Sequence, residues 1–253
     1  MSVPINEMSE KLVRVRERIE RAASRAGRRA DEITLIAISK THPAERIREL
    51  YEAGVRHFGE NRAQEWESKR AHLADLDATW HMIGHVQSNK AARVVRLFNS
   101  IDTVDSVALA KRLDRALHTE NTGVTENTNG VEVLPQRLRV LIEVKLDPEP
   151  AKSGASGDIG SNELQSLVES VSRMPRLELR GLMGVPPYFD DPEKTRPYFR
   201  RLRELRDALR SKIGDEILPV LSMGMSHDFE VAIEEGATEI RVGSALFGER
   251  RKA

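Results

Sequence analysis

Lys40 is the residue with the clearest chemical potential, because it closes the apolar run of residues 33–39 and stands directly before Thr41, His42 and Pro43. A lysine at the end of a buried strand is partly desolvated, and burial disfavours its charged form. The resulting free amine can attack a carbonyl group and form an imine. The alternative is that Lys40 only marks the point where the strand reaches water, because charged residues are mostly exposed.

Two segments of small residues could bind a phosphate group. One contains Ser222, Gly224 and Ser226, and the other contains Gly243 and Ser244. Glycine lets backbone N–H groups approach a phosphate, serine adds a hydroxyl donor, and a following helix adds the positive end of its dipole. One glycine alone is a weak indication, because glycine also makes turns. Two such segments, each at the end of an expected strand, are a stronger one.

Other polar residues lie near strand ends. Arg241 precedes Gly243 by two positions, so both share one face of a strand. A buried arginine needs a partner, which could be a ligand atom or one of the many carboxylates. Asn61 follows the expected second strand and could donate to a ligand oxygen. His81 and His85 have no further ligands at a metal-binding spacing, so we expect no metal.

Alternating strands and helices must position these residues. Apolar runs predict eight strands, at residues 34–39, 55–58, 79–83, 100–104, 138–144, 177–183, 218–222 and 239–242. Helical spacing predicts helices between them, at residues 43–53, 62–75, 88–97, 106–119, 161–173, 192–212 and 228–235. The repeated units imply a parallel sheet with right-handed crossovers, and their number predicts an α/β fold of the (β/α)8 TIM-barrel type. An open doubly wound sheet is the alternative, but no Gly-x-Gly-x-x-Gly turn follows the first strand.

Three segments lie outside this alternation. A helix is expected before the first strand, covering one end of the barrel, because one apolar stripe has helical spacing: Ile5, Met8, Leu12, Val15 and Ile19. The polar loop at residues 119–136 precedes a strand, so we expect it at the N-terminal face, away from the chemistry. The loop at residues 147–160 follows a strand and is either a lid or a plain surface loop.

Composition excludes several classes of protein. The chain of 253 residues is long enough for one large α/β domain, and its 40 basic and 40 acidic residues give zero net charge. This balance gives no reason to expect a nucleic-acid or membrane partner. The chain has no cysteine, which excludes disulfides and thiolate catalysis. The first residues lack the apolar core of a secretory signal, so we expect a cytoplasmic protein.

A lysine that faces a phosphate-binding segment serves two known chemistries. One is an imine between lysine and pyridoxal 5′-phosphate (PLP), and the other is an imine with a phosphorylated sugar, as in aldolases. The residues alone leave both open, while a pure interaction protein is disfavoured by the many polar strand ends.

The chain resembles the pyridoxal phosphate homeostasis protein family, also called the PLP-binding protein family. The resemblance runs from about Met8 to Arg250 and is carried by residues 36–43, 58–65, 80–90, 181–183, 221–226 and 241–248. It implies a single PLP-binding domain over residues 1–253, similar to the N-terminal domain of alanine racemase. Two departures are present: Lys145 stands where the family usually has asparagine, and Ser244 replaces a threonine but keeps the hydroxyl.

The resemblance also implies roles for individual residues. Lys40 would hold PLP as an internal aldimine, and Arg241 would face the pyridine nitrogen and keep it unprotonated. The ring would then be a weaker electron sink for carbanion chemistry. The residues implied for phosphate binding are Ser222, Ser226, Gly243 and Ser244, and no role is carried over to Lys145.

We expect a PLP carrier for intracellular PLP homeostasis rather than an enzyme. Alanine racemase needs a second, β-rich domain that brings a tyrosine base to the other face of the cofactor, and proton abstraction from both faces needs an acid or base on each. The chain ends at Ala253, soon after the last strand, which leaves no room for such a domain. The expected partners are PLP and PLP-requiring apo-enzymes, and the expected state is a monomer. A PLP-dependent amino-acid racemase is the alternative, and a lysine-imine aldolase is a third possibility.

Overall fold

The structure is a computed structural model that describes residues 7–122, 137–147, 149, 154–156 and 162–248. Residues 123–136 and most of residues 147–160 lie outside the described part of the chain. The expectations for these two loops therefore concern residues that the structure does not describe. No described helix is long and apolar enough to cross a membrane.

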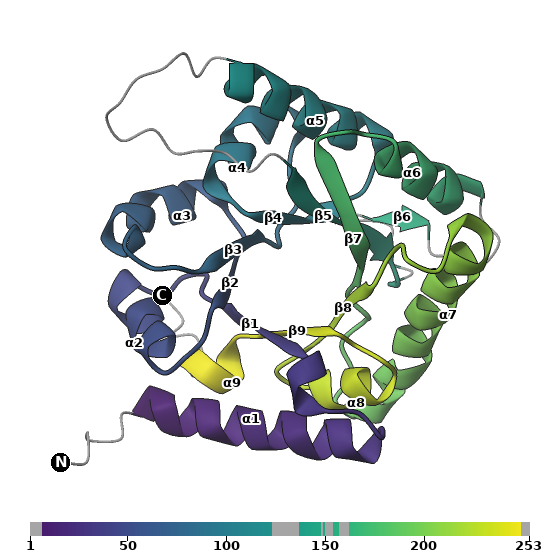
Figure 1. The fold of residues 1–253 in the computed structure, drawn as a ribbon. Coiled ribbons are helices and arrows are strands. Elements are labelled where there is room, and N and C mark those ends of the chain that lie inside the picture. Colours follow the sequence, from purple (N-terminus) through teal and green to yellow (C-terminus); the bar gives the residue numbers. More distant parts are fainter. Residues whose placement is uncertain (1–6, 123–136, 148, 150–153, 157–161, 249–253) are drawn as a thin grey trace.

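Eight parallel strands close into a barrel (Figure 1). The strand order is β4-β3-β2-β1-β9-β8-β7-β5, and the pairing of β4 with β5 closes the ring. A further two-residue strand, β6 (Ala155–Ser156), pairs with the end of β5. The barrel strands are β1 (Thr34–Ile38), β2 (His57–Glu60), β3 (Thr79–Met82), β4 (Ser100–Val104), β5 (Leu138–Lys145), β7 (Leu177–Gly184), β8 (Val220–Met225) and β9 (Glu239–Val242). This architecture confirms the predicted (β/α)8 barrel.

Helices surround the barrel (Figure 1). Short 3-10 turns form the end of the predicted helix at residues 62–75 (Ala71–Leu73) and the starts of those at 88–97 (Ser88–Lys90) and 192–212 (Pro192–Thr195). Ala30–Glu32 forms a fourth. The α-helices are α1 (Glu7–Arg25), α2 (Ala44–Glu52), α3 (Ala63–Arg70), α4 (Ala91–Leu97), α5 (Val107–Thr122), α6 (Asn162–Ser172), α7 (Arg196–Ile213), α8 (Phe229–Glu234) and α9 (Ser244–Phe247). With the 3-10 turns included, the helix bounds agree with the predicted ones to within three residues, and α9 was not predicted.

The N-terminal helix α1 lies in the outer ring of helices (Figure 1). The expectation that it covers one end of the barrel was therefore wrong. Its apolar stripe is buried, with Met8, Leu12, Val15 and Ile19 at most 5% exposed, and it packs against α2, α8 and α9. The physical reason is that α8 and α9 are too short to cover the barrel wall beside them. The stripe of α1 completes this cover and so removes apolar surface from water.

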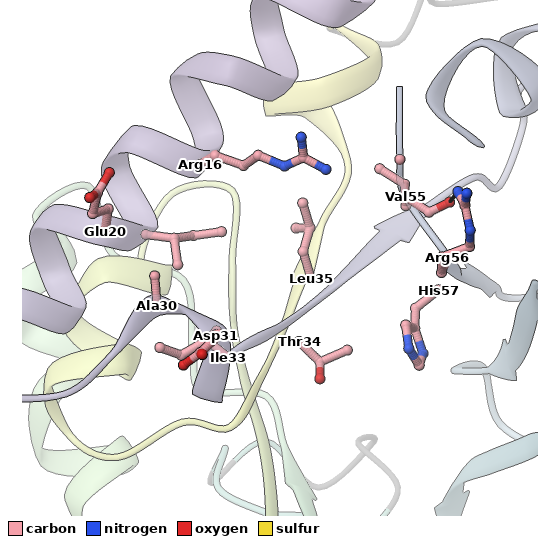
Figure 2. A pocket seen from close by; sticks show the side chains of 12 residues that line it. Arg16, Glu20, Ala30, Asp31, Ile33, Thr34, Leu35, Val55, Arg56 and His57 are labelled. Atoms are coloured by element: carbon pink, nitrogen blue, oxygen red, sulfur yellow. Dashed lines mark hydrogen bonds between the residues drawn. The ribbon is translucent and has the colours of Figure 1, made fainter. Parts of the chain in front are cut away.

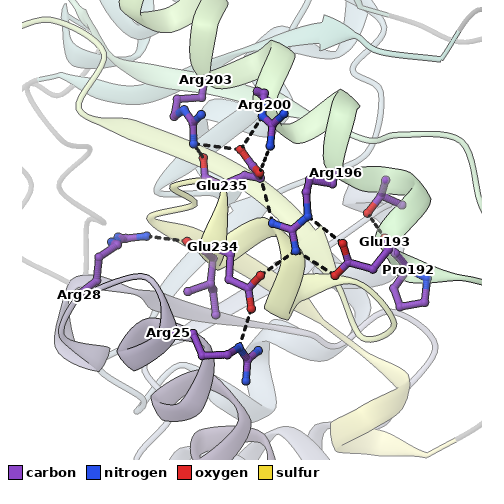
Figure 3. Close-up of polar contacts among 11 residues, drawn as sticks. Arg25, Arg28, Pro192, Glu193, Arg196, Arg200, Arg203, Glu234 and Glu235 are labelled. Carbon is purple, nitrogen blue, oxygen red and sulfur yellow. Dashed lines mark hydrogen bonds and ion pairs between the residues drawn. The ribbon is translucent and has the colours of Figure 1, made fainter.

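Ion pairs fasten this part of the outer ring (Figure 3). The Glu235 carboxylate, only 5% exposed, lies 3.2 Å from Arg196, 3.0 Å from Arg200 and 3.0 Å from Arg203 on α7. Glu234 pairs with Arg196 and, at 2.7 Å, with Arg25 of α1. These carboxylates at the end of α8 therefore tie α7 to α1.

A polar network fills the N-terminal half of the barrel interior. His57 Nδ1 lies 3.0 Å from His81 Nε2, and His81 Nδ1 lies 3.0 Å from Asp102 Oδ2. Arg139 contacts Glu239, although β5 and β9 are not neighbours in the sheet, so this contact crosses the barrel. Because His81 and Asp102 are fully buried, the hydrogen bonds offset the cost of placing polar groups there.

Candidate functional site

A pocket opens at the end of the barrel formed by the carboxyl ends of the strands. Its volume is about 230 Å³, slightly below the range of about 300–1000 Å³ typical of drug-sized ligands, so it suits a small molecule. It is lined by Ile38, Lys40, His42, Tyr188, Met225, Ser226, His227, Arg241, Gly243, Ser244 and Gly248. Five of the seven expected cofactor-binding residues thus meet here: Lys40, Ser226, Arg241, Gly243 and Ser244.

A tight turn after β1 carries Lys40. The His42 N–H donates to the Ser39 carbonyl at 3.1 Å, which makes Lys40 and Thr41 the two central residues of a β-turn. Thr41 has a φ of 67°, a value that the third position of a type II turn requires and that usually selects glycine or asparagine. His42 stacks on Phe247 of α9 with ring centroids 4.3 Å apart. The turn is therefore packed against the segment that follows β9.

Ser226 joins the two segments of small residues. Its hydroxyl oxygen accepts hydrogen bonds from the Gly243 N–H at 3.1 Å and from the Ala245 N–H at 3.2 Å. At Gly224 the φ is 91°, and an added Cβ would lie 2.6 Å from the Cβ of Ala232, so only glycine fits there. This glycine lets the chain turn at the end of β8 and bring Ser226 to the start of α9.

Arg241 lies in β9 and is only 4% exposed. One guanidinium nitrogen donates to Ser222 Oγ at 2.8 Å, and the other donates to the Gly184 carbonyl at 2.9 Å. Burial lowers the pKa of this guanidinium, while the carboxylates of Asp102 and Asp228 act in the opposite direction. The guanidinium thus donates to a hydroxyl and to a carbonyl, and these two bonds fix it in the lining of the pocket.

Asn61 and Ser222 do not line this pocket. Ser222 is fully buried behind Arg241, where it orients the guanidinium. Asn61 is partly buried after β2, and a Cβ added to Gly84 would lie 2.1 Å from its carbonyl oxygen. The ends of β2 and β3 therefore touch each other at Asn61. Lys145 is also partly buried at the end of β5 and is absent from the pocket lining.

Four rim residues were not predicted from the sequence: His42, Tyr188, Met225 and His227. Tyr188 is 74% exposed, and its ring centroid lies 5.5 Å from that of His227. His227 Nε2 lies 3.1 Å from the Phe189 carbonyl, so this histidine holds the segment after β7 beside the segment after β8. The sequence carries no signal for this contact, because 38 residues separate the two partners.

A larger cavity of about 470 Å³ lies at the opposite end of the barrel, between α1 and the starts of β1 and β2 (Figure 2). No lysine lines it, and its polar side chains are those of Arg16, Glu20, Asp31, Thr34, Arg56 and His57. Of these two pockets, the smaller one is the one lined by a lysine. The described residues contain no group of three or more His, Cys, Asp or Glu that could hold a metal ion.

Comparison with known proteins identifies the class of this barrel. The family described as the N-terminal domain of alanine racemase matches residues 11–251. An alanine racemase of Clostridium difficile superposes with a TM-score of 0.68 at 12% identity, covering 100% of this chain and 60% of that one, and so shares the fold.

Full-length relatives narrow the identification. The pyridoxal phosphate homeostasis protein of Aquifex aeolicus is 43% identical over 242 residues, 96% of this chain and 98% of the relative. That of Escherichia coli K12 is 38% identical over 253 residues, 97% of this chain and 98% of the relative. The structure of PipY from Synechococcus elongatus with PLP bound superposes with a TM-score of 0.78 at 37% identity, covering 96% of this chain and 100% of that one. The chain therefore belongs to the pyridoxal phosphate homeostasis protein family.

The pocket residues fit PLP. Lys40 offers an amine, Ser226 and Ser244 offer hydroxyls, and Gly243 leaves open space, since a Cβ added to it would come no closer than 3.5 Å to another atom. Arg241 offers a fixed cation below them. This set matches the aldehyde, the phosphate and the ring nitrogen of PLP.

Proposed function

We propose that this protein takes part in intracellular PLP homeostasis as a carrier that binds PLP covalently through Lys40. The observation that carries the proposal is the meeting of Lys40 with Ser226, Gly243 and Ser244 in one small pocket. The relatives named as homeostasis proteins and the PLP-bound PipY structure support it. A cytoplasmic monomer and delivery to PLP-requiring apo-enzymes are part of the same proposal.

Each pocket residue has a role in this proposal. PLP supplies an aldehyde, to which the Lys40 amine forms a C=N bond as one water molecule leaves. The hydroxyls of Ser226 and Ser244 bind the phosphate, and Gly243 leaves space for it beside them. Arg241, held by Ser222, directs a cation toward the ring nitrogen, which disfavours protonation of that nitrogen. Asn61, which lies outside the pocket lining, would act only through the neighbouring strand ends.

One observation keeps an amino-acid racemase as the second candidate. Tyr188 lines the pocket together with Lys40, so two groups able to transfer protons share it. However, Tyr188 is 74% exposed, whereas proton transfer needs a base in a fixed position. Interconversion of L- and D-alanine by the pure protein, lost in Tyr188→Phe, would favour the racemase over the carrier.

Borohydride trapping tests the covalent bond. Reduction of the PLP-loaded protein and peptide mapping should place a pyridoxyl group on Lys40, and Lys40→Met should abolish it. Lys145→Met is the matched control, because Lys145 also lies at the carboxyl end of a barrel strand, and it should keep the adduct. An adduct that maps mainly to another lysine, or no adduct on the wild type, refutes the proposal.

A further inference from the structure

Beneath the turn that carries Lys40 lies a second lysine, Lys69 of α3, which is only 8% exposed. Its ammonium nitrogen lies 2.7 Å from Glu60 Oε1 and 3.1 Å from Glu65 Oε1. It also donates to two backbone carbonyls, that of Ser39 at 3.0 Å and that of His42 at 3.1 Å. These carbonyls belong to the first and last residues of the turn. One buried ammonium group therefore binds the backbone on both sides of Lys40.

The carboxylates of Glu60 and Glu65 also bind the turn. Ser39 Oγ donates to Glu60 Oε1 at 2.7 Å, and the Thr41 N–H donates to Glu65 Oε1. Burial has the largest effect and raises the pKa of Glu60 above its ordinary value, although the Lys69 ammonium and the Ser39 hydroxyl act in the opposite direction. Lys69 and the two acids thus hold the backbone on either side of Lys40.

Thr41 needs such support. Its φ of 67° lies in the left-handed region, which is unfavourable for a β-branched residue because its Cβ crowds the backbone. Strained residues of this kind persist only when the surrounding structure holds them. Without its contacts, Thr41 would relax to a negative φ. Lys40 and Thr41 are the two central residues of one turn between Ser39 and His42, so the backbone at Lys40 would have to change with it.

We propose that Lys69, with Glu60 and Glu65, is a positioning unit that holds the strained Thr41 turn and thereby aims Lys40 into the cofactor pocket. The inference rests on the proposed function, because it assigns a purpose to the orientation of Lys40. Lys69 itself is not among the residues that line the pocket. It acts through the backbone of Ser39 and His42.

A mutant cycle with Thr41→Gly separates positioning from general stability. Lys69→Met removes the ammonium at similar length, and we expect it to weaken PLP binding about tenfold, equivalent to about 1.4 kcal/mol. Glycine adopts a positive φ without strain, so Lys69→Met/Thr41→Gly should bind within about threefold of Thr41→Gly alone. If Lys69 only stabilised the fold, glycine would give no rescue, because it adds conformational freedom to the unfolded chain.

Glu65→Ala covers the case in which Lys69→Met fails to fold. The Glu65 side chain is 27% exposed, and its removal leaves the Lys69–Glu60 pair in place. We expect the Thr41 amide to exchange its hydrogen at least about tenfold faster in this variant without cofactor, since its carboxylate acceptor is gone. Glu67→Gln is the matched control on the same helix, because Glu67 pairs with Arg93 and not with the turn. It should leave both the exchange rate and PLP binding unchanged.

The results separate the two proposals. Wild-type affinity in Lys69→Met, or no rescue by Thr41→Gly in a folded double variant, overturns the positioning role. Unchanged Thr41 exchange in Glu65→Ala overturns it as well. If the wild-type protein traps no PLP on Lys40, the proposed function is refuted instead. Hydrogen exchange of the Thr41 amide without cofactor would still test whether these residues hold the turn.

Discussion

The pair formed by the partly buried His57 and the buried His81 predicts a specific loss of stability in acid. His57 Nδ1 lies 3.0 Å from His81 Nε2, so protonation of His57 would place a charge beside its histidine neighbour and near Arg139. Burial, then His81, then Arg139 lower the pKa of His57 from 6.5 to about 4, and Asp102 opposes them. The folded protein therefore resists protonation that the unfolded chain accepts.

The sign and size of this effect follow from linkage. Between pH 6.5 and about 4 the unfolded state binds more protons at His57 than the folded state, so this contribution to stability is present above pH 6.5 and is lost as the pH falls. At about 1.36 kcal/mol per pH unit the full difference corresponds to roughly 3 kcal/mol. Because His57 is only partly buried, solvent screening reduces the expected loss to about 1–2 kcal/mol.

Urea unfolding of the wild type and of His57→Gln at pH 7, 6 and 5 measures this loss. Glutamine can still bond to His81 but does not titrate, so the two free energies of unfolding should converge as the pH falls. His72→Gln is the control, because His72 is exposed, and it should follow the wild type at every pH. Curves for His57→Gln and the wild type that run parallel from pH 7 to pH 5 would refute the assignment.

Two further substitutions test the pocket and the outer ring. Gly243→Ala should fold normally, because the new Cβ would lie 3.5 Å from Ile38, which is an ordinary contact. It should weaken PLP binding about tenfold, because the methyl group fills the space beside the phosphate. Thermal melting measures the first effect, and titration with PLP followed by absorbance measures the second. Glu235→Gln should lower the free energy of unfolding by about 1–2 kcal/mol, because the buried carboxylate faces three arginines, and Glu7→Gln at an exposed pair should not change it in the same urea assay.

The repeating pattern of the chain was enough to predict the barrel. Most strands have an apolar run and most helices an apolar stripe, so the order of elements could be derived from local periodicity. The position of α1 could not be derived in this way, because its apolar stripe indicates burial but does not identify the elements that cover it. That depended on the shortness of α8 and α9, which leaves part of the barrel wall to cover.

The interior network and the Lys69 cluster lay beyond sequence reasoning for another reason. His81, Asp102, Arg139 and Glu239 come from four strands, and each alone is a polar residue of ordinary type. Lys69 stands on a helix among other charged residues, where exposure would be the usual expectation. Only the closed barrel and the packing of α3 bring their partners within reach.

Sheet order also explains which strand ends form the pocket. Lys40 follows β1, Gly243 follows β9 and Ser226 follows β8, and these three strands are consecutive in the closed sheet. Asn61 follows β2, on the other side of β1, and so it faces Gly84 at the end of β3 instead of the pocket. The positions of polar residues at strand ends therefore predict which end of the barrel holds the pocket. They do not predict which strands contribute to it. In the positioning proposal, the turn after β1 orients Lys40 toward the pocket, so the residues beneath that turn should affect PLP binding.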